Sequence, residues 1–340
     1  MIRIGNKEIN TNIFLAPLSA CSDLPFRLIA REHGAKFCFF EMSDSNSLKY
    51  GSRRSDRILR TVPEDQPIAA QLLGTDPEVM LAAAEKILKR APITFLDVNA
   101  ACPARKIYKK GSGACLLINP DPLYRILERL TRALPVPVTV KMRVGINQVD
   151  IARAVPFAKG CVDSGAAALF VHGRSRSQEN YGPVSYEAIR AVKEAVGVPV
   201  FGSGNILNPL LAKKMFDETG CDGILVAKGS FGNPYIFRDI ETYLETGAWT
   251  PTTELRRKLG VLKKHLVMVR ELDGSRSDWR VGELAKICLW YLKGFAEASR
   301  MRASIYSSKT HQELIDQIDR LAENPPCLRP VFAIAARPSI

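Results

Sequence analysis

The chain has no closely spaced cysteine pairs. Its eight cysteines form no Cys-x-x-Cys motif, and several lie inside apolar segments, as Cys38 does in segment 37–40. This distribution is typical of buried free thiols in a reducing compartment, and it argues against a disulfide framework. The sequence also has no cluster of Asp, Glu and His with the spacing of metal ligands, so we expect no bound metal.

Long apolar runs are missing as well. No stretch approaches the roughly 20 residues that a transmembrane helix needs, and residues 1–7 lack the apolar run of a signal peptide. We therefore expect a cytoplasmic protein without a membrane partner. Acidic residues are few, with 35 Asp and Glu against 48 Lys and Arg, which gives a net charge of +13. Such a balance favours polyanions such as nucleic acid, and a solvated basic helical face is the simpler alternative.

Eight short apolar segments alternate with amphipathic ones. Because they are continuously apolar, they are typical of a parallel sheet that is covered on both sides. The expected strands are 13–16, 37–42, 68–73, 94–98, 136–142, 168–172, 199–202 and 223–227. Eight strand–helix units in about 245 residues match a (β/α)8 TIM barrel in count and length. A doubly wound sheet is the alternative, but it requires a glycine-rich first turn, whereas this turn reads Ala16-Pro17-Leu18-Ser19-Ala20.

Several helices have recognisable starts. Asp76-Pro77, Asp121-Pro122 and Asn208-Pro209 each place a capping side chain before a proline, the arrangement expected at a helix N-terminus.

The pattern changes after residue 247. Segment 247–253 has the composition of a linker, and beyond it the sequence has no strand signals. Apolar residues recur at helical spacing in 255–272, 281–299 and 312–322, which predicts three amphipathic helices. We expect a catalytic barrel over 1–247, a small all-helical domain over 251–323, and a poorly ordered tail rich in Pro and Arg over 324–340.

Polar and small residues follow the expected strands at their carboxyl ends. On a barrel these ends meet at one face, so we expect the residues to lie together there. In chain order they are Ala16, Pro17, Leu18, Gln71, Asn99, Cys102, Lys141, Arg143, His172, Arg174, Ser203, Gly204, Asn205, Ala227 and Lys228. A single Cys or His is more often structural than functional. Their joint placement on one face is the stronger signal.

Two glycine-containing loops, 203–205 and 227–230, are candidates for binding a phosphate group. Glycine lets backbone amides approach an anion, and Lys228 adds a positive charge; tight turns without a ligand are the alternative. Lys141 at the end of a buried strand requires a partner, which is a bound anion, an electron-rich ring or the carboxylate of Asp97. For Gln71 two alternatives are open: its side chain hydrogen-bonds to the polar edge of a planar heterocycle, or it is buried and hydrogen-bonded to backbone.

These residues resemble those of the tRNA-dihydrouridine synthases, most closely their bacterial B-type branch. The most specific element is Asn99-x-x-Cys102-Pro103 with Gly111 and Gly113 downstream. The other matching elements cover nearly the whole barrel. They are Ala16-Pro17-Leu18, Asp23-Leu24-Pro25-Phe26-Arg27, Gln71-Leu72-Leu73-Gly74, Val140-Lys141-Met142-Arg143, Val171-His172-Gly173-Arg174 and Gly232-Asn233-Pro234-Tyr235-Ile236-Phe237.

The resemblance implies an FMN-dependent oxidoreductase that uses NADPH to reduce the C5–C6 double bond of uridines in tRNA. The target base would be extruded from the RNA stack, and Cys102 would act as the general acid that protonates C5. The implied cofactor-binding residues are Ala16, Pro17, Leu18, Gln71, Lys141, His172, Ser203, Gly204, Asn205, Ala227 and Lys228. The implied substrate-binding residues are Asn99, Arg143, Arg174, Lys106, Lys110 and Lys286. The helical domain would help to hold tRNA, and we expect a monomer, with a dimer left open.

The chain departs from the family pattern in both phosphate loops and in the helical domain. Ser203-Gly204-Asn205 replaces Asn-Gly-Asp, and Ala227-Lys228 replaces Gly-Arg. Lysine is a point charge without the bidentate fork of arginine, and Asn205 removes a negative charge nearby. We expect FMN to bind, although less tightly. In the helical domain, Ala285 and Ile287 stand beside Lys286 where the family has Arg and His.

Two other functions are compatible with such a barrel. The first is an FMN-dependent dehydrogenase of a small pyrimidine or dihydroorotate-type substrate, which needs no basic helical appendage. The second is a redox-inactive RNA-binding paralogue, and the altered phosphate loops favour this alternative. The presence of Asn99, Cys102, Lys141 and His172 argues against lost catalysis.

Overall fold

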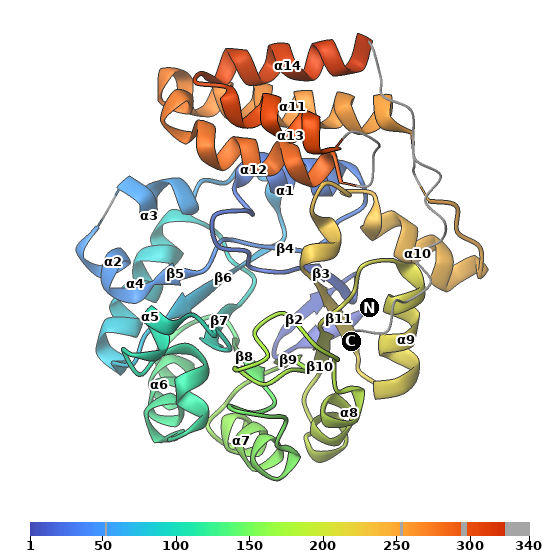
Figure 1. The fold of residues 1–340 in the computed structure, drawn as a ribbon. Coiled ribbons are helices and arrows are strands. Elements are labelled where there is room, and N and C mark those ends of the chain that lie inside the picture. Colours follow the sequence, from blue (N-terminus) through green and yellow to red (C-terminus); the bar gives the residue numbers. More distant parts are fainter. Residues whose placement is uncertain (52, 252–253, 294–297, 324–340) are drawn as a thin grey trace.

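Eight parallel strands form a barrel with helices around it (Figure 1). The computed structural model describes residues 1–51, 53–251, 254–293 and 298–323. The barrel strands are β3 (Ile13–Leu15), β4 (Cys38–Phe39), β6 (Ile68–Leu73), β7 (Leu96–Ala100), β8 (Val138–Arg143), β9 (Leu169–His172), β10 (Val200–Ser203) and β11 (Gly223–Val226). Each strand expected from the sequence overlaps one of them. The predicted (β/α)8 TIM barrel is confirmed.

The strands are ordered β3-β11-β10-β9-β8-β7-β6-β4. A parallel bridge between Phe14 and Phe37, with a 2.9 Å hydrogen bond from the Leu15 amide to the Phe37 carbonyl, joins the first strand to the last. A short strand β5 (Ser43–Asp44) follows β4 in the chain and also pairs with β6. The sheet therefore closes on itself, and the carboxyl ends of its strands surround one opening.

An antiparallel hairpin that the sequence did not predict precedes the barrel. It consists of β1 (Ile2–Ile4) and β2 (Lys7–Ile9). Its isoleucines are buried in the same apolar cluster as the aromatic side chains of the barrel interior. Strands of three residues are too short for an alternating pattern to stand out, so local sequence gives no signal of this hairpin.

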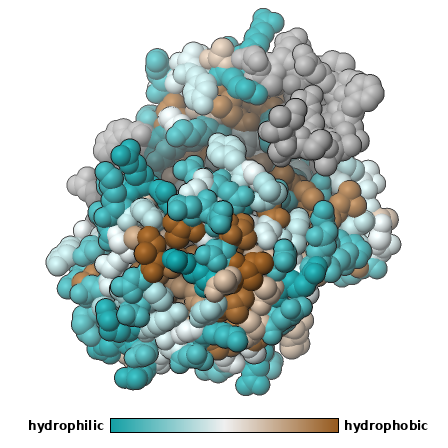
Figure 2. All heavy atoms as spheres, turned by 60° about the horizontal axis from the view of Figure 1, so that its bottom comes forward, coloured by the Kyte–Doolittle hydropathy of each residue, from teal (hydrophilic) through white to brown (hydrophobic). Residues whose placement is uncertain are grey.

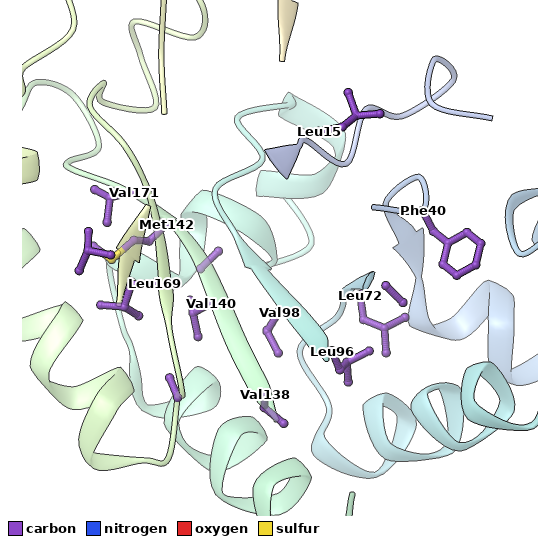
Figure 3. Packing of buried hydrophobic residues seen from close by; sticks show 14 of the residues in the cluster. Leu15, Phe40, Leu72, Leu96, Val98, Val138, Val140, Met142, Leu169 and Val171 are labelled. Atoms are coloured by element: carbon purple, nitrogen blue, oxygen red, sulfur yellow. The ribbon is translucent and has the colours of Figure 1, made fainter. Parts of the chain in front are cut away.

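Side chains alternate along the strands between the inside and the outside of the barrel. On β8, Val138, Val140 and Met142 belong to the cluster between strands and helices (Figure 3), so Thr139 and Lys141 face the interior. One interior layer is aromatic, with ring centroids 4.2 to 6.4 Å apart. It is built from Phe14, Phe37, Phe39, Phe95, Phe170 and Phe201. The barrel is thus a packed core, and polar side chains occupy the interior positions nearer the carboxyl ends.

Ten α-helices belong to the barrel region of the described chain. They are α1 (Leu24–Glu32), α2 (Ser45–Tyr50), α3 (Arg53–Ile58), α4 (Pro77–Arg90), α5 (Arg105–Tyr108), α6 (Asp121–Ala133), α7 (Ile151–Asp163), α8 (Tyr186–Ala195), α9 (Pro209–Thr219) and α10 (Ile236–Thr246). Asp76 and Asn208 cap α4 and α9, each accepting a hydrogen bond from a backbone amide, as expected. The same expectation for Asp121 is wrong: Asp121 is the first residue of α6, and Pro120 occupies the cap position.

The C-terminal region is helical, as expected, and lies against the barrel (Figure 1). It contains α11 (Leu255–Asp273), α12 (Val281–Tyr291), α13 (Ala298–Ser307) and α14 (His311–Glu323). The single helix expected over 281–299 is wrong, because α12 ends at Tyr291 and a separate helix begins at Ala298. The sequence has a glycine at position 294, a residue that disfavours a continuous helix. The domain boundaries stay a prediction, and the expected tail 324–340 lies outside the described residues.

An aromatic stack fixes the helical region to the barrel. The Trp290 ring lies parallel to Phe231, with centroids 4.1 Å apart and an interplanar angle of 9°, and meets Phe26 edge-on at 6.4 Å. A Cβ on Gly232 would lie 2.2 Å from the Trp290 carbonyl oxygen. Glycine at 232 is therefore required for close approach. Phe26 and Gly232 therefore help α12 to pack against the barrel. Both residues belong to the motifs that resemble the family.

Buried ion pairs reinforce this interface. Arg280 of the helical region donates to Asp23, the N-cap residue of α1, at 2.7 Å and to Asp273 at 2.8 Å. Burial would raise the pKa of the Asp23 carboxyl, but His265, 3.8 Å away, and the ion pair with Arg280 hold that pKa well below its usual range. The interface thus keeps Asp23 ionised in the folded protein.

Most of the surface that is visible in Figure 2 is hydrophilic, and hydrophobic residues gather near the middle of that face. None of the helices in the described part of the chain is both long and apolar enough to cross a membrane.

Candidate active site

A cavity of about 310 Å³ opens at the carboxyl ends of the strands. Its lining brings together all the predicted cofactor-binding residues, Cys102, and three predicted substrate-binding residues, Asn99, Arg143 and Arg174. The sequence did not single out the other lining residues. They are Ser19, Met42, Ala101, Pro103, Asn180, Ile206, Leu207 and Leu225. Met42 and Leu225 belong to expected strands but were not expected at a site, because apolar residues carry no chemical signal of one.

A chain of side-chain amides forms one edge of the cavity. Asn99 donates from Nδ2 to Gln71 Oε1 at 2.7 Å and approaches Met42 Sδ at 3.2 Å. Asn99 Oδ1 accepts from the backbone amides of Ala101 and Cys102 at 3.0 and 2.8 Å. The Asn99 side chain therefore fixes the backbone that carries the Cys102 thiol. Gln71 forms its hydrogen bonds with the side chains of Asp97 and Asn99. The alternative prediction, that Gln71 is hydrogen-bonded to backbone, is therefore wrong.

Cys102 is a free, partly exposed thiol at the start of the loop that contains α5. Its carbonyl accepts from the Ala114 amide at 3.1 Å, which fastens the end of the loop to its beginning. Arg143 is buried and donates from Nε to the Ala101 carbonyl at 2.8 Å and from Nη1 to the Ser175 carbonyl at 2.8 Å. The arginine thus ties the tip of β7 to the loop after β9.

Positive charge gathers next to these amides, at the ends of β8 and β9, where Lys141 is the register partner of Asn99. Burial, the positive charge of Arg143 and the opposing charge of Asp97 together leave the pKa of Lys141 lowered to about 8. Burial and the charges of Lys141, Arg143 and Arg174 hold the pKa of His172 well below its usual range, so the imidazole is neutral. Arg174 Nη1 lies 3.3 Å from His172 Nε2. Since the guanidinium only donates, Nε2 accepts and Nδ1 carries the proton.

The two predicted phosphate loops lie next to this basic side. Asn205 has a left-handed backbone, with φ of 54°, and its Oδ1 accepts from Arg174 Nη2 at 2.7 Å. A Cβ on Gly204 would lie 3.2 Å from His172 Cδ2, so a side chain there would crowd the imidazole. Among the described residues that line the cavity, none is a carboxylate. The basic side therefore suits an anionic group.

Three predicted substrate-binding lysines lie outside this cavity. Lys106 and Lys110 line a neighbouring cavity of about 330 Å³, which shares Ser19 and Met42 with the first. Lys286 is exposed on α12. Burial and the charge of Glu41 raise the pKa of the Cys21 thiol to about 12, and the charge of Lys286 opposes that shift. The charge of Lys286 therefore reaches the loop that follows β3.

Comparison with known proteins identifies the family. The sequence model of the family described as Dihydrouridine synthase (Dus) matches residues 14–324. The chain belongs to the dihydrouridine synthase family. The resemblance inferred from the sequence is thus confirmed, and the chain is an oxidoreductase of that family.

Curated relatives agree with this assignment. The chain is 35% identical over 303 residues to tRNA-dihydrouridine synthase B of Pseudomonas aeruginosa, covering 89% of this chain and 90% of that protein. It is 33% identical over 325 residues to tRNA-dihydrouridine synthase B of Escherichia coli, covering 95% and 99%. A solved structure of an old yellow enzyme homologue from Zymomonas mobilis superposes with a TM-score of 0.53 at 15% identity, covering 73% of this chain and 92% of that one. This last likeness concerns the fold alone.

Proposed function

We propose that the protein reduces the C5–C6 double bond of specific uridines in tRNA to dihydrouridine, with FMN as its cofactor and NADPH as the reductant. The class of reaction rests on the family to which the chain belongs. The observation that carries the proposal is the single cavity that joins the Cys102 thiol, the Asn99 and Gln71 amides and a basic pocket without carboxylates.

The cavity fits FMN in three respects. Ala16, Pro17 and Leu18 offer an apolar wall, and Gln71 and Asn99 offer amides for the polar edge of a heterocycle. Among the described residues, none forms a hydrogen bond or an ion pair with the Lys141 ammonium, which lines the cavity. A bound anionic ring would supply the missing partner. When bound and reduced, FMN supplies the hydride that C6 of uracil accepts.

The phosphate of FMN would lie against loops 203–205 and 227–230. The Arg174 and Lys228 side chains bring positive charge to that side of the cavity. Asn205 rather than a carboxylate accepts from Arg174, and within the described part of the chain no carboxylate pairs with this guanidinium. This charge offsets part of the loss caused by lysine at 228, which lacks the arginine fork.

Cys102 would protonate C5 of the uracil. Its thiol lies at the entrance of a loop that carries Lys106 and Lys110, whose ammonium groups suit RNA phosphates. Asn99 would orient the uracil ring while it holds the Cys102 amide. The base must leave the RNA stack to reach a cavity at the end of a barrel.

The polyanionic substrate accounts for the net charge of +13. Exposed Lys286 would extend the RNA surface onto the helical region. We expect the enzyme to act as a cytoplasmic monomer.

The test is a map of dihydrouridine in total RNA from cells with and without the gene, repeated after complementation with wild type and with Cys102→Ala. Loss of particular dihydrouridines that only the wild type restores is expected. An unchanged map would contradict the proposal. Purified protein that stays colourless with excess FMN and still binds tRNA would instead indicate an RNA-binding paralogue. Reduction of a free pyrimidine without tRNA would indicate a small-molecule dehydrogenase.

A further inference from the structure

Asp97 is a fully buried carboxylate that the proposed chemistry does not use. It lies on β7, two residues before Asn99 and on the same face of the strand. Strand register places Gln71 of β6 and Thr139 of β8 directly beside it. Both neighbours donate to it: Gln71 Nε2 to Oδ2 at 2.6 Å and Thr139 Oγ1 to Oδ1 at 2.7 Å. Each carboxylate oxygen therefore has its own donor.

A carboxylate fixes the direction of the amides that follow it. Ionised Asp97 only accepts, so Gln71 must turn its Nε2 toward Asp97 and its Oε1 toward Asn99. Asn99 must then turn Nδ2 toward Gln71, which leaves Oδ1 for the backbone amides of Ala101 and Cys102. If the Asn99 side-chain amide were reversed, its Nδ2 donor would face the backbone N–H donors of Ala101 and Cys102. Donors facing donors leave these groups without hydrogen bonds, so the arrangement is unfavourable. Only one orientation satisfies every bond.

We propose that Asp97 is a positioning residue for the proposed reaction, which fixes the orientation of the Gln71 and Asn99 amides and thereby places Cys102. Thr139 assists by holding Asp97 in its ionised form. This inference rests on the proposed function, and it concerns two residues that do not line the cavity.

The orientation depends on the charge of Asp97. Burial raises the pKa of the Asp97 carboxyl to about 7. The hydrogen bonds from Thr139 and Gln71 and the positive charge of Lys141, which faces Asp97, oppose this rise. Protonated Asp97 has an O–H to donate, so Gln71 gains a second orientation with Oε1 toward Asp97. The positioning is therefore present above the Asp97 pKa and lost as pH falls through it.

The decisive experiment compares Thr139→Val with Thr139→Ser in the full-length holoenzyme. Valine has the shape of threonine without the donor, so the Asp97 pKa rises further, and the acid limb of kcat against pH moves up by about 1–2 pH units. Serine keeps the donor and leaves the limb in place. Superimposable profiles of both variants and wild type overturn the inference, because a merely structural role of Thr139 does not move a pH profile.

Asp97→Asn supplies a second measurement. An asparagine can meet Gln71 with either end, so kcat falls roughly 10- to 100-fold, while KM for tRNA stays within about twofold because phosphate contacts supply that affinity. The acid limb assigned to Asp97 disappears. An unchanged kcat in a folded, flavin-loaded variant overturns the inference.

A transposed pair tests the direction of the bonds. When Asp97→Asn is combined with Gln71→Glu, the introduced amide accepts from Thr139 and donates to the introduced carboxylate. That carboxylate in turn accepts from Asn99, so Asn99 keeps its orientation. The double variant is expected to be more active than either single variant. Activity no higher than that of the better single variant, in a double variant that binds flavin as tightly as wild type, overturns the inference.

A readout without turnover separates this inference from the proposed function. The rate constant of Cys102 alkylation by iodoacetamide, followed by peptide mass spectrometry and divided by the thiolate fraction measured in the same variant, is expected to show an acid limb whose midpoint moves upward in Thr139→Val and not in Thr139→Ser. If wild type forms no dihydrouridine, the proposed function fails while this shift still supports the positioning of Cys102. If wild type is active and the midpoint does not move, only the inference fails.

Discussion

Gly113 gives the sharpest test of how the loop holds Cys102. Its backbone is left-handed, with φ of 63°. A Cβ there would lie 2.8 Å from the Cys102 carbonyl oxygen and 3.1 Å from both Cys102 Cβ and Ile107 Cγ2. The same carbonyl accepts from the Ala114 amide at 3.1 Å, so it has little freedom to move alone. In Gly113→Ala the segment that carries the thiol must therefore shift.

Gly111→Ala is the matched control. Gly111 is also left-handed, with φ of 76°, but a Cβ there would meet only Thr75 Cγ2 at 3.9 Å. In both variants a side chain in this backbone region costs about 1–2 kcal/mol. Only Gly113→Ala also pushes on Cys102, and a displacement of about 1 Å at a reacting group costs roughly 100-fold in rate.

The assay is single-turnover formation of dihydrouridine on tRNA by reduced enzyme, with thermal unfolding of both variants measured in parallel. We expect Gly113→Ala to lose about two orders of magnitude in rate, and Gly111→Ala to stay close to wild type with a reduced melting temperature. Equal rates for the two variants would refute the reasoning, because the shared backbone strain would then account for the whole effect.

Three further predictions follow from the same structure. Cys102→Ala should lose about 10²- to 10⁴-fold in product formation, whereas bleaching of the bound flavin by NADPH should stay at the wild-type rate in stopped-flow absorbance. Replacing Lys106 and Lys110 by Ala should flatten the slope of log Kd for tRNA against log salt by about 1 for each phosphate that is no longer neutralised; an unchanged slope would remove both lysines from the RNA surface. Arg280→Ala should lower the free energy of unfolding by about 3–5 kcal/mol, because it removes the arginine partner of the buried Asp23 carboxylate. Since the folded-state pKa of Asp23 lies below its ordinary 3.8, the stability that wild type gains from this pair is present above that pH and is lost as pH falls toward the folded pKa. Denaturant titrations that show the same acid dependence in both proteins would contradict this assignment.

The strands and their polar ends were predictable because both follow from local patterns. A buried parallel strand is continuously apolar, and the eight such runs here overlap the eight barrel strands. The residues just after each run then share one face by topology alone. Gln71, Cys102, Lys141 and His172 meet in one cavity for this reason, although they are far apart in the chain.

Other features could not be read from local pattern. The β1–β2 hairpin consists of strands of three residues, and α12 ends at Tyr291 within a segment whose apolar spacing predicts a longer helix. The chemical partners of a side chain also depend on its neighbours across strands. Arg174, a predicted substrate-binding residue, meets His172 and Asn205 within the protein, and its own sequence neighbours give no sign of these contacts.

The sequence by itself determined the barrel, its helical C-terminal region and the set of side chains at the strand ends, because hydrophobic periodicity and chain order suffice for these. Only the tertiary structure decided which of them touch and with what charge. Register across β6, β7 and β8 places Asp97 between Gln71 and Thr139, and burial raises its pKa to about 7. The contacts and the charge of a side chain depend on the distances between strands and on the exclusion of water. The order of residues along one strand determines neither.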